Sequence, residues 1–124
     1  KSDLLDLLWA TATGADLPET AEWHPGVCVG VVIASRGYPA SSSKGDAIEG
    51  VEAAAGLPDV KVYQAGTACK EGRLVTAGGR VLVVAARGKD FATARERAYE
   101  GVGKISFPGM QWRTDIAQRA AGRG

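Results

Sequence analysis

The sequence lacks any apolar run long enough to cross a bilayer. Its longest run, residues 27–35, has the length of a strand, whereas a membrane-spanning helix needs roughly 20 consecutive apolar residues. The first five residues, Lys1-Ser2-Asp3-Leu4-Leu5, also lack the apolar core and the cleavage site of a secretory leader. We therefore expect no membrane partner, and the reduced thiol that the strand pattern predicts for Cys28 indicates a cytoplasmic protein.

Cysteine and histidine are scarce, which excludes several kinds of site. Cys28 and Cys69 form no CxxC motif, and a single histidine cannot complete a zinc ligand set. His24 precedes Pro25 in a polar loop, and no serine stands in a G-x-S-x-G elbow, so a catalytic triad is excluded and His24 is predicted to lie at the surface. Cys28 falls within a strand pattern, which predicts a buried, reduced thiol.

An excess of charge of either sign is also missing. Fifteen basic residues nearly balance fourteen acidic ones, whereas a protein that binds nucleic acid generally carries a basic excess. No Walker A loop and no G-x-G-x-x-G motif follows a predicted strand. Asp46, Glu49 and Glu52 have the spacing of a solvated helix face. The chain by itself therefore contains no complete catalytic apparatus.

Glycine, in contrast, is abundant, with seventeen in 124 residues, and it divides the chain into short elements. Leucines and Trp9 at helical spacing predict a first helix capped by Ser2 and ended by Gly14. The pattern then predicts a strand over 27–35, a short helix within 46–56, strands over 60–65, 73–76 and 80–86, a helix after Asp90 and a closing helix after Thr114.

This order of elements predicts an α+β fold, a small antiparallel sheet flanked by helices. The strand over 27–35 is apolar on both faces and is therefore expected at the centre of the sheet. Residues 77–79 are expected to join the last two strands as a hairpin. The first helix has a wide apolar stripe at the start of a chain without an initiator Met, so we expect a fragment whose stripe packs on other surface.

Two glycine-rich loops remain as candidate binding elements. Gly37-Tyr38-Pro39 follows the end of a strand and is interpreted mainly as a structural turn. Gly78-Gly79-Arg80 can expose backbone N–H groups as an anion nest beside a guanidinium that clasps a phosphate. From the motif alone, a hairpin turn with a surface arginine is the better explanation.

Several short segments stand in the order and spacing of one known family. They are Lys1-Ser2-Asp3-Leu4, Gly37-Tyr38-Pro39, Lys44-Gly45-Asp46-Ala47-Ile48-Glu49-Gly50, Ala65-Gly66-Thr67, Gly78-Gly79-Arg80-Val81-Leu82 and Arg113-Thr114-Asp115-Ile116. This series resembles the C-terminal part of phosphoribosylamine–glycine ligase, the domain that follows the ATP-grasp domain. The resemblance implies that residues 1–24 are a helix and linker from the end of the ATP-grasp domain, and that residues 25–124 are the C-terminal domain.

The resemblance also implies a function for the full-length enzyme in de novo purine biosynthesis. That family joins glycine to 5-phosphoribosylamine through a glycyl phosphate, using ATP and Mg²⁺, to give glycinamide ribonucleotide. The family's nucleotide and magnesium ligands belong to segments absent from this sequence. We therefore expect this chain to bind neither ATP nor Mg²⁺ by itself, to be inactive alone, and to have the N-terminal and ATP-grasp domains of the same polypeptide as its partners.

The resemblance assigns no catalytic residue and no metal ligand to this chain. It implies substrate-binding roles for Gly78, Gly79 and Arg80, which face the phosphorylated substrate in related enzymes, and for Lys1 and Ser2. Where the family usually has glycine, this sequence has Arg36, Ala40 and Ala117, which puts the geometry of the first loop in question. The competing hypothesis is a stand-alone, non-catalytic module that binds a phosphorylated metabolite or a partner protein.

Overall fold

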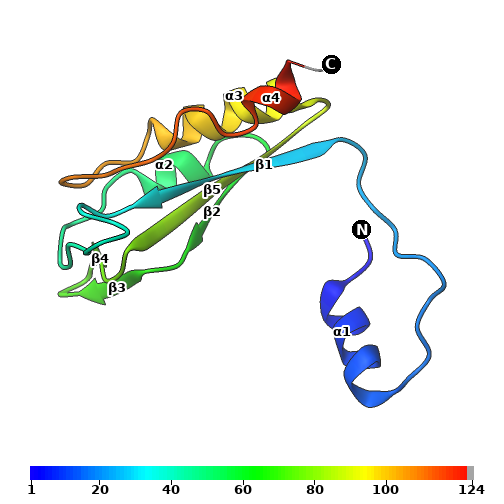
Figure 1. Ribbon diagram of the computed structural model, residues 1–124. Helices are drawn as coiled ribbons and strands as arrows, with labels where there is room; N and C mark the ends of the chain where they lie inside the picture. Colours follow the sequence, from blue (N-terminus) through cyan, green and yellow to red (C-terminus); the bar gives the residue numbers. More distant parts are fainter. Residues whose placement is uncertain (123–124) are drawn as a thin grey trace.

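The computed structural model describes residues 1–122, which form an α+β structure with two small antiparallel sheets (Figure 1). The elements in chain order are α1 (Leu4–Thr13), β1 (Val27–Ala34), α2 (Val51–Ala55), β2 (Val60–Gln64), β3 (Thr67–Lys70), β4 (Arg73–Thr76), β5 (Arg80–Gly88), α3 (Phe91–Val102) and α4 (Gln118–Ala121). The predicted fold class is confirmed. None of the helices in this part of the chain is long and apolar enough to cross a membrane.

The larger sheet has the order β1-β5-β2, and both neighbours of β5 run antiparallel to it. Val84 of β5 stands opposite Val31 on one side and Val62 on the other. β5 is therefore the central strand. The prediction that β1 is central is wrong, because β1 pairs along one side only.

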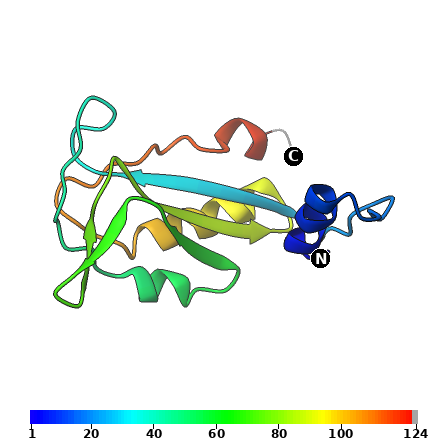
Figure 2. The same cartoon turned by 90° about the horizontal axis from the view of Figure 1, so that it is seen from below.

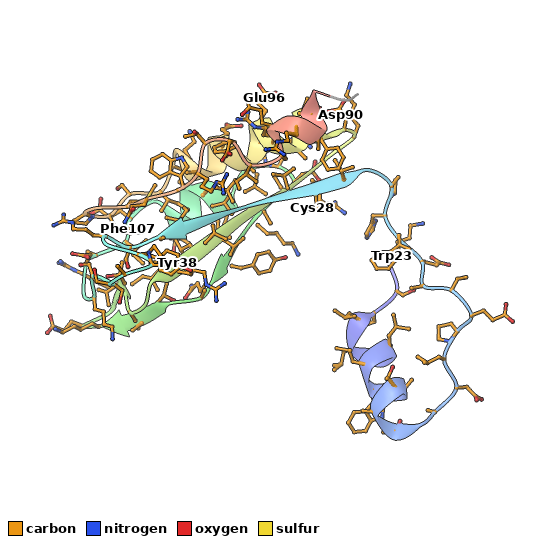
Figure 3. All side chains as sticks on the ribbon, viewed as in Figure 1. Trp23, Cys28, Tyr38, Asp90, Glu96 and Phe107 are labelled. Atoms are coloured by element: carbon orange, nitrogen blue, oxygen red, sulfur yellow. The ribbon has the colours of Figure 1, made fainter. Side chains whose placement is uncertain are left out.

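Both faces of β1 are apolar, but only one of them is buried. Val29, Val31 and Ile33 are buried in the core, whereas Cys28 and Val32 on the other face are exposed. No element among the described residues covers that second face of the sheet. Cys28 is thus an exposed free thiol, and the predicted buried state is wrong (Figure 3).

Helix α3 runs along the covered face of the sheet (Figure 2). Ala94, Ala98 and Val102 are buried against β1 and β5, and their small side chains let the helix approach the strands closely. Asp90 caps the helix as predicted, since its Oδ1 accepts a hydrogen bond of 2.8 Å from the Thr93 N–H. This hydrogen bond lowers the pKa of the Asp90 carboxyl.

The smaller sheet is a hairpin of β3 and β4 that sequence reasoning missed. Glu71 and Gly72 connect the strands, with φ of 52° and 75°. Positive φ at both residues is the requirement of a two-residue type I′ turn. Residues 77–79 consequently do not form the predicted hairpin, because β4 pairs with β3 while β5 pairs with β1 and β2.

Helix α1 lies apart from the sheet, at the end of a long connection (Figure 1). Its cap is Asp3, whose Oδ1 accepts from the Leu5 N–H at 2.8 Å, so the predicted cap at Ser2 is wrong. Gly14 ends the helix in the left-handed conformation, as predicted. The apolar stripe is uncovered, with Leu5 and Trp9 70% and 68% exposed.

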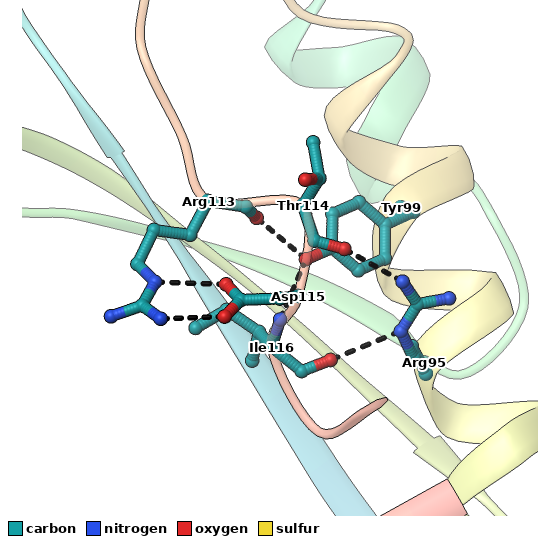
Figure 4. A network of polar contacts seen from close by, with 6 residues as sticks. All are labelled: Arg95, Tyr99, Arg113, Thr114, Asp115 and Ile116. Atoms are coloured by element: carbon teal, nitrogen blue, oxygen red, sulfur yellow. Dashed lines mark hydrogen bonds and ion pairs between the residues drawn. The ribbon is translucent and has the colours of Figure 1, made fainter. Parts of the chain in front are cut away.

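The chain after α3 is tied back to that helix by a network of polar contacts (Figure 4). The Tyr99 hydroxyl donates to the Arg113 carbonyl at 2.6 Å and accepts from the Ile116 N–H at 3.2 Å. Arg95 donates to the Thr114 and Ile116 carbonyls and lies over the Tyr99 ring. The prediction that Thr114 caps the closing helix is wrong, because α4 begins later and Ala117 occupies its cap position.

Candidate functional site

The candidate site lies where β1 ends and β5 begins, at the end of the sheet marked by Tyr38 in Figure 3. Ser35, directly after β1, is fully buried. Its N–H donates to the Gly79 carbonyl at 2.8 Å, and its hydroxyl donates to the Gly78 carbonyl at 3.0 Å. A buried hydroxyl with a backbone partner fixes the turn before β5.

Close packing explains why residues 78 and 79 are glycines. A Cβ on Gly78 would lie 3.2 Å from the Gly66 Cα, and a Cβ on Gly79 would lie 2.5 Å from Cδ2 of Tyr38. Neither glycine has positive φ, so left-handed backbone is not the reason for their presence. The Gly66 N–H donates to the Arg80 carbonyl at 2.9 Å, which holds the turn from its other side.

An open depression of about 560 Å³ lies beside this turn. Its lining combines apolar side chains of the uncovered sheet face with the turn and the loop after β1: Val32, Tyr38, Ala65, Gly66, Gly79, Arg80 and Val83. The structure therefore brings Gly79 and Arg80 together with Tyr38 in one pocket. Gly78 lies directly behind it.

The pocket offers hydrogen-bond donors and positive charge. Arg80 is exposed, and its guanidinium makes no hydrogen bond or ion pair with any described residue. The N–H groups of Gly78 and Gly79 likewise find no acceptor within residues 1–122. Of the two glycines, only Gly79 lines the pocket together with Arg80. A free guanidinium beside a free N–H group suits a phosphate or carboxylate, and Val32 and Val83 add apolar surface to the lining.

Lys1 and Ser2, the other predicted substrate contacts, lie elsewhere. The N-terminal α-ammonium group of Lys1 donates to the Glu22 carbonyl at 2.8 Å, and the Ser2 hydroxyl accepts from the Glu22 N–H at 2.8 Å. These residues belong to the segment around α1, whereas the Gly78–Arg80 turn lies at the far end of the sheet (Figures 1 and 2). The structure does not bring the two groups into one pocket.

The carboxylates near α2 do not form the predicted helix face. α2 begins only at Val51, and Asp46 lies before it in a loop tied to β4. The Asp46 carboxylate accepts from the Ser43 and Thr76 hydroxyls. Within residues 1–122, no group of three histidine, cysteine or acidic side chains is arranged to hold a metal ion.

The three positions at which the resemblance led us to expect glycine, Arg36, Ala40 and Ala117, differ in their backbone conformation. Arg36 and Ala40 do not have positive φ, so the first loop carries no backbone strain from them. Arg36 instead packs against Gly109, where a Cβ would lie 2.8 Å from the Arg36 Cβ. Ala117 does adopt the left-handed conformation, with φ of 58°, and alanine pays a steric cost there that glycine avoids.

A second charged cluster lies at the opposite end of β5. Asp59 accepts from Arg97 at 2.7 Å and from Arg87 at 3.3 Å, and Arg97 also donates to the Arg87 carbonyl. The carboxylate neutralises part of the positive charge, and the contacts join α3, β5 and the start of β2. This cluster is best explained as a structural link between elements.

Sequence reasoning singled out Arg80 and its glycines as candidates but did not identify Ser35 and Gly66, which hydrogen-bond to the same turn. Ser35 was the last residue of the predicted strand over 27–35, where nothing local distinguishes a buried hydroxyl from a solvated one. Gly66 belongs to the Ala65-Gly66-Thr67 motif, which was noted only as part of a series. Both residues act through partners more than ten positions away, so no local pattern could reveal their roles.

Comparisons with known proteins agree on one family. The family model described as "Phosphoribosylglycinamide synthetase, C domain" matches residues 28–119. Phosphoribosylamine–glycine ligase of Synechocystis sp. is 54% identical over 99 residues, which are 80% of this chain and 23% of that protein. The enzyme of that name from Neisseria meningitidis is 47% identical over 123 residues, 98% of this chain and 29% of that protein.

A solved structure supports the same assignment. The crystal structure of phosphoribosylamine–glycine ligase from Thermotoga maritima aligns with a TM-score of 0.76 at 35% identity, over 90% of this chain and 26% of that one. The chain therefore spans between 23% and 29% of the length of these relatives. What matches is their C-terminal domain.

Proposed function

Because the chain belongs to the family of phosphoribosylglycinamide synthetase C domains, we propose that it serves within a ligase that joins glycine to 5-phosphoribosylamine. The product is glycinamide ribonucleotide, an intermediate of de novo purine biosynthesis. The family match over residues 28–119 is the observation that carries the proposal. The printed names of the relatives agree with it.

The partners of this chain in that reaction are the other domains of the same polypeptide. We propose that residues 1–24 complete an ATP-grasp domain and that residues 25–124 form the C-terminal domain, in the cytoplasm. The separation of α1 from the sheet supports this boundary (Figure 1). We assign ATP and Mg²⁺ to the remainder of the polypeptide, because the family resemblance places the nucleotide and metal ligands in segments outside this sequence.

Within the ligase, this chain forms one wall of the substrate cleft. We assign the phosphate of phosphoribosylamine to Arg80 and to the N–H groups of Gly78 and Gly79, since these donors have no acceptor among the described residues. The apolar surface of the pocket suits the sugar ring. Lys1 and Ser2 take no part in this pocket, so a substrate contact by them depends on where residues 1–24 lie in the whole ligase.

The proposal is tested by expressing the complete polypeptide that contains this chain. We expect it to form glycinamide ribonucleotide from glycine and phosphoribosylamine with consumption of one ATP per product, measured by coupled release of ADP and by mass of the product. Omitting glycine or phosphoribosylamine is the control and should abolish ADP release. A polypeptide that binds phosphoribosylamine without forming product would instead support a non-catalytic module.

A further inference from the structure

We propose that Tyr38 is a positioning residue whose ring holds the Gly78-Gly79-Arg80 turn, so that Arg80 faces the pocket. The inference rests on the proposed function, since it takes Arg80 as the group that binds the phosphate of phosphoribosylamine. Tyr38 belongs to a loop that sequence analysis interpreted as a structural turn. Its contacts connect that loop to the candidate binding element.

The Tyr38 ring occupies the space that a side chain at residue 79 would fill. An added Cβ on Gly79 would lie 2.5 Å from Cδ2 and 3.0 Å from Cε2 of the ring. The ring is 40% exposed and also lines the depression that Arg80 borders. One side of the ring therefore covers the turn, while the rest of it faces the pocket.

The loop that carries Tyr38 is itself fixed to the same turn. The Tyr38 N–H donates to the Ser35 carbonyl at 3.3 Å, and the Gln111 amide donates to that carbonyl at 2.8 Å. Ser35 in turn binds the carbonyls of Gly78 and Gly79. Loop and turn thus share one buried anchor, and the ring closes the side of the turn that faces the pocket.

Removing the ring would uncover Gly79, which has no side chain of its own. Glycine backbone is more mobile than that of any other residue, so the turn would sample several positions and Arg80 would lose its fixed direction. The Tyr38 hydroxyl makes no hydrogen bond with residues 1–122. The ring, and not the hydroxyl, is therefore the part that positions the turn.

The test uses the complete ligase and compares Tyr38→Phe, Tyr38→Ala, Arg80→Ala and the double variant Tyr38→Ala/Arg80→Ala. We expect Tyr38→Ala to raise the apparent KM for phosphoribosylamine about tenfold, with the KM for glycine and for ATP unchanged. Tyr38→Phe should stay within about twofold of the parent. In the Arg80→Ala background, Tyr38→Ala should add less than about twofold, because no guanidinium remains to be positioned.

Tyr63→Ala is the matched control, since Tyr63 is an exposed tyrosine of β2 outside the pocket lining. If Tyr38→Ala changes the KM for phosphoribosylamine no more than Tyr63→Ala does, the inference is overturned, even where Arg80→Ala raises that KM. If Tyr38→Phe raises the KM for phosphoribosylamine as much as Tyr38→Ala does, the inference is also overturned, because the hydroxyl and not the ring then has the role. A parallel rise of all three KM values with a lowered Tm shows a merely structural role. An unchanged KM in Arg80→Ala removes the phosphate assignment and the inference together.

Discussion

Gly50 shows how one residue can link two segments far apart in the sequence. It stands before α2 with φ of 80°, and a Cβ at this position would overlap the Lys104 carbonyl oxygen. Gly45 has a similar φ of 86° but nothing within 4 Å of its Cβ position. Replacing each glycine by alanine would therefore give the free-energy cost of left-handed backbone alone at residue 45, and that cost plus the cost of a steric overlap at residue 50.

We predict that Gly50→Ala destabilises the protein by about 3 kcal/mol or more, because backbone strain and overpacking add. Gly45→Ala, the control, should cost about 1–2 kcal/mol from backbone strain alone. Urea denaturation followed by circular dichroism measures both. Equal midpoints for the two variants would show that the Lys104 carbonyl can move aside, which contradicts the packing argument.

At the scale of elements, Tyr99 joins α3 to the chain that follows it. Its hydroxyl serves two backbone groups, the Arg113 carbonyl and the Ile116 N–H (Figure 4). We predict that Tyr99→Phe lowers the free energy of unfolding by about 1–2 kcal/mol, because both groups lose a partner. Hydrogen exchange should also speed up at Ile116. Tyr63→Phe, whose hydroxyl has no hydrogen-bond partner in residues 1–122, should leave both measurements unchanged.

The ion pair in the same segment contributes to its local geometry. Arg113 donates two hydrogen bonds to Asp115, at 2.8 and 2.6 Å. They lower the pKa of the Asp115 carboxyl and raise that of Arg113. Both side chains are exposed, so solvent weakens the pair, and the network around Tyr99 is the stronger anchor.

At the scale of the molecule, the function proposed above gives this chain one wall of a binding pocket, and the other domains of the ligase complete the site. The sheet face that carries Val32 and Tyr63 is uncovered, as is the apolar stripe of α1. We predict that the isolated chain forms no glycinamide ribonucleotide from ATP, glycine and phosphoribosylamine. Product analysis by mass spectrometry, with the complete ligase as positive control, checks this. Turnover by the isolated chain would mean that residues 1–124 hold chemistry not recognised in them.

The elements themselves were largely predictable because their causes are local. Alternating apolar residues located β1 and β5, and the Asp90 cap and the Gly14 stop lie within a few residues of the helices they delimit. The β3–β4 hairpin was missed because Glu71-Gly72 is an unusual sequence for a type I′ turn, in which Asn-Gly is the common choice. The errors at Ser2 and Thr114 each placed a cap on a residue near the true helix start.

Three conclusions came from the sequence by itself. The order of the motifs indicated the family, the periodicity of apolar residues predicted the α+β class, and the Gly78-Gly79-Arg80 motif made Arg80 the candidate phosphate ligand. Only the tertiary structure decided that β5 is central, that Cys28 is exposed and that Ser35, Gly66 and Tyr38 contact residues 78–80. These facts depend on which strands pair and which faces are covered. Contacts between distant residues set them, and no local pattern encodes such contacts.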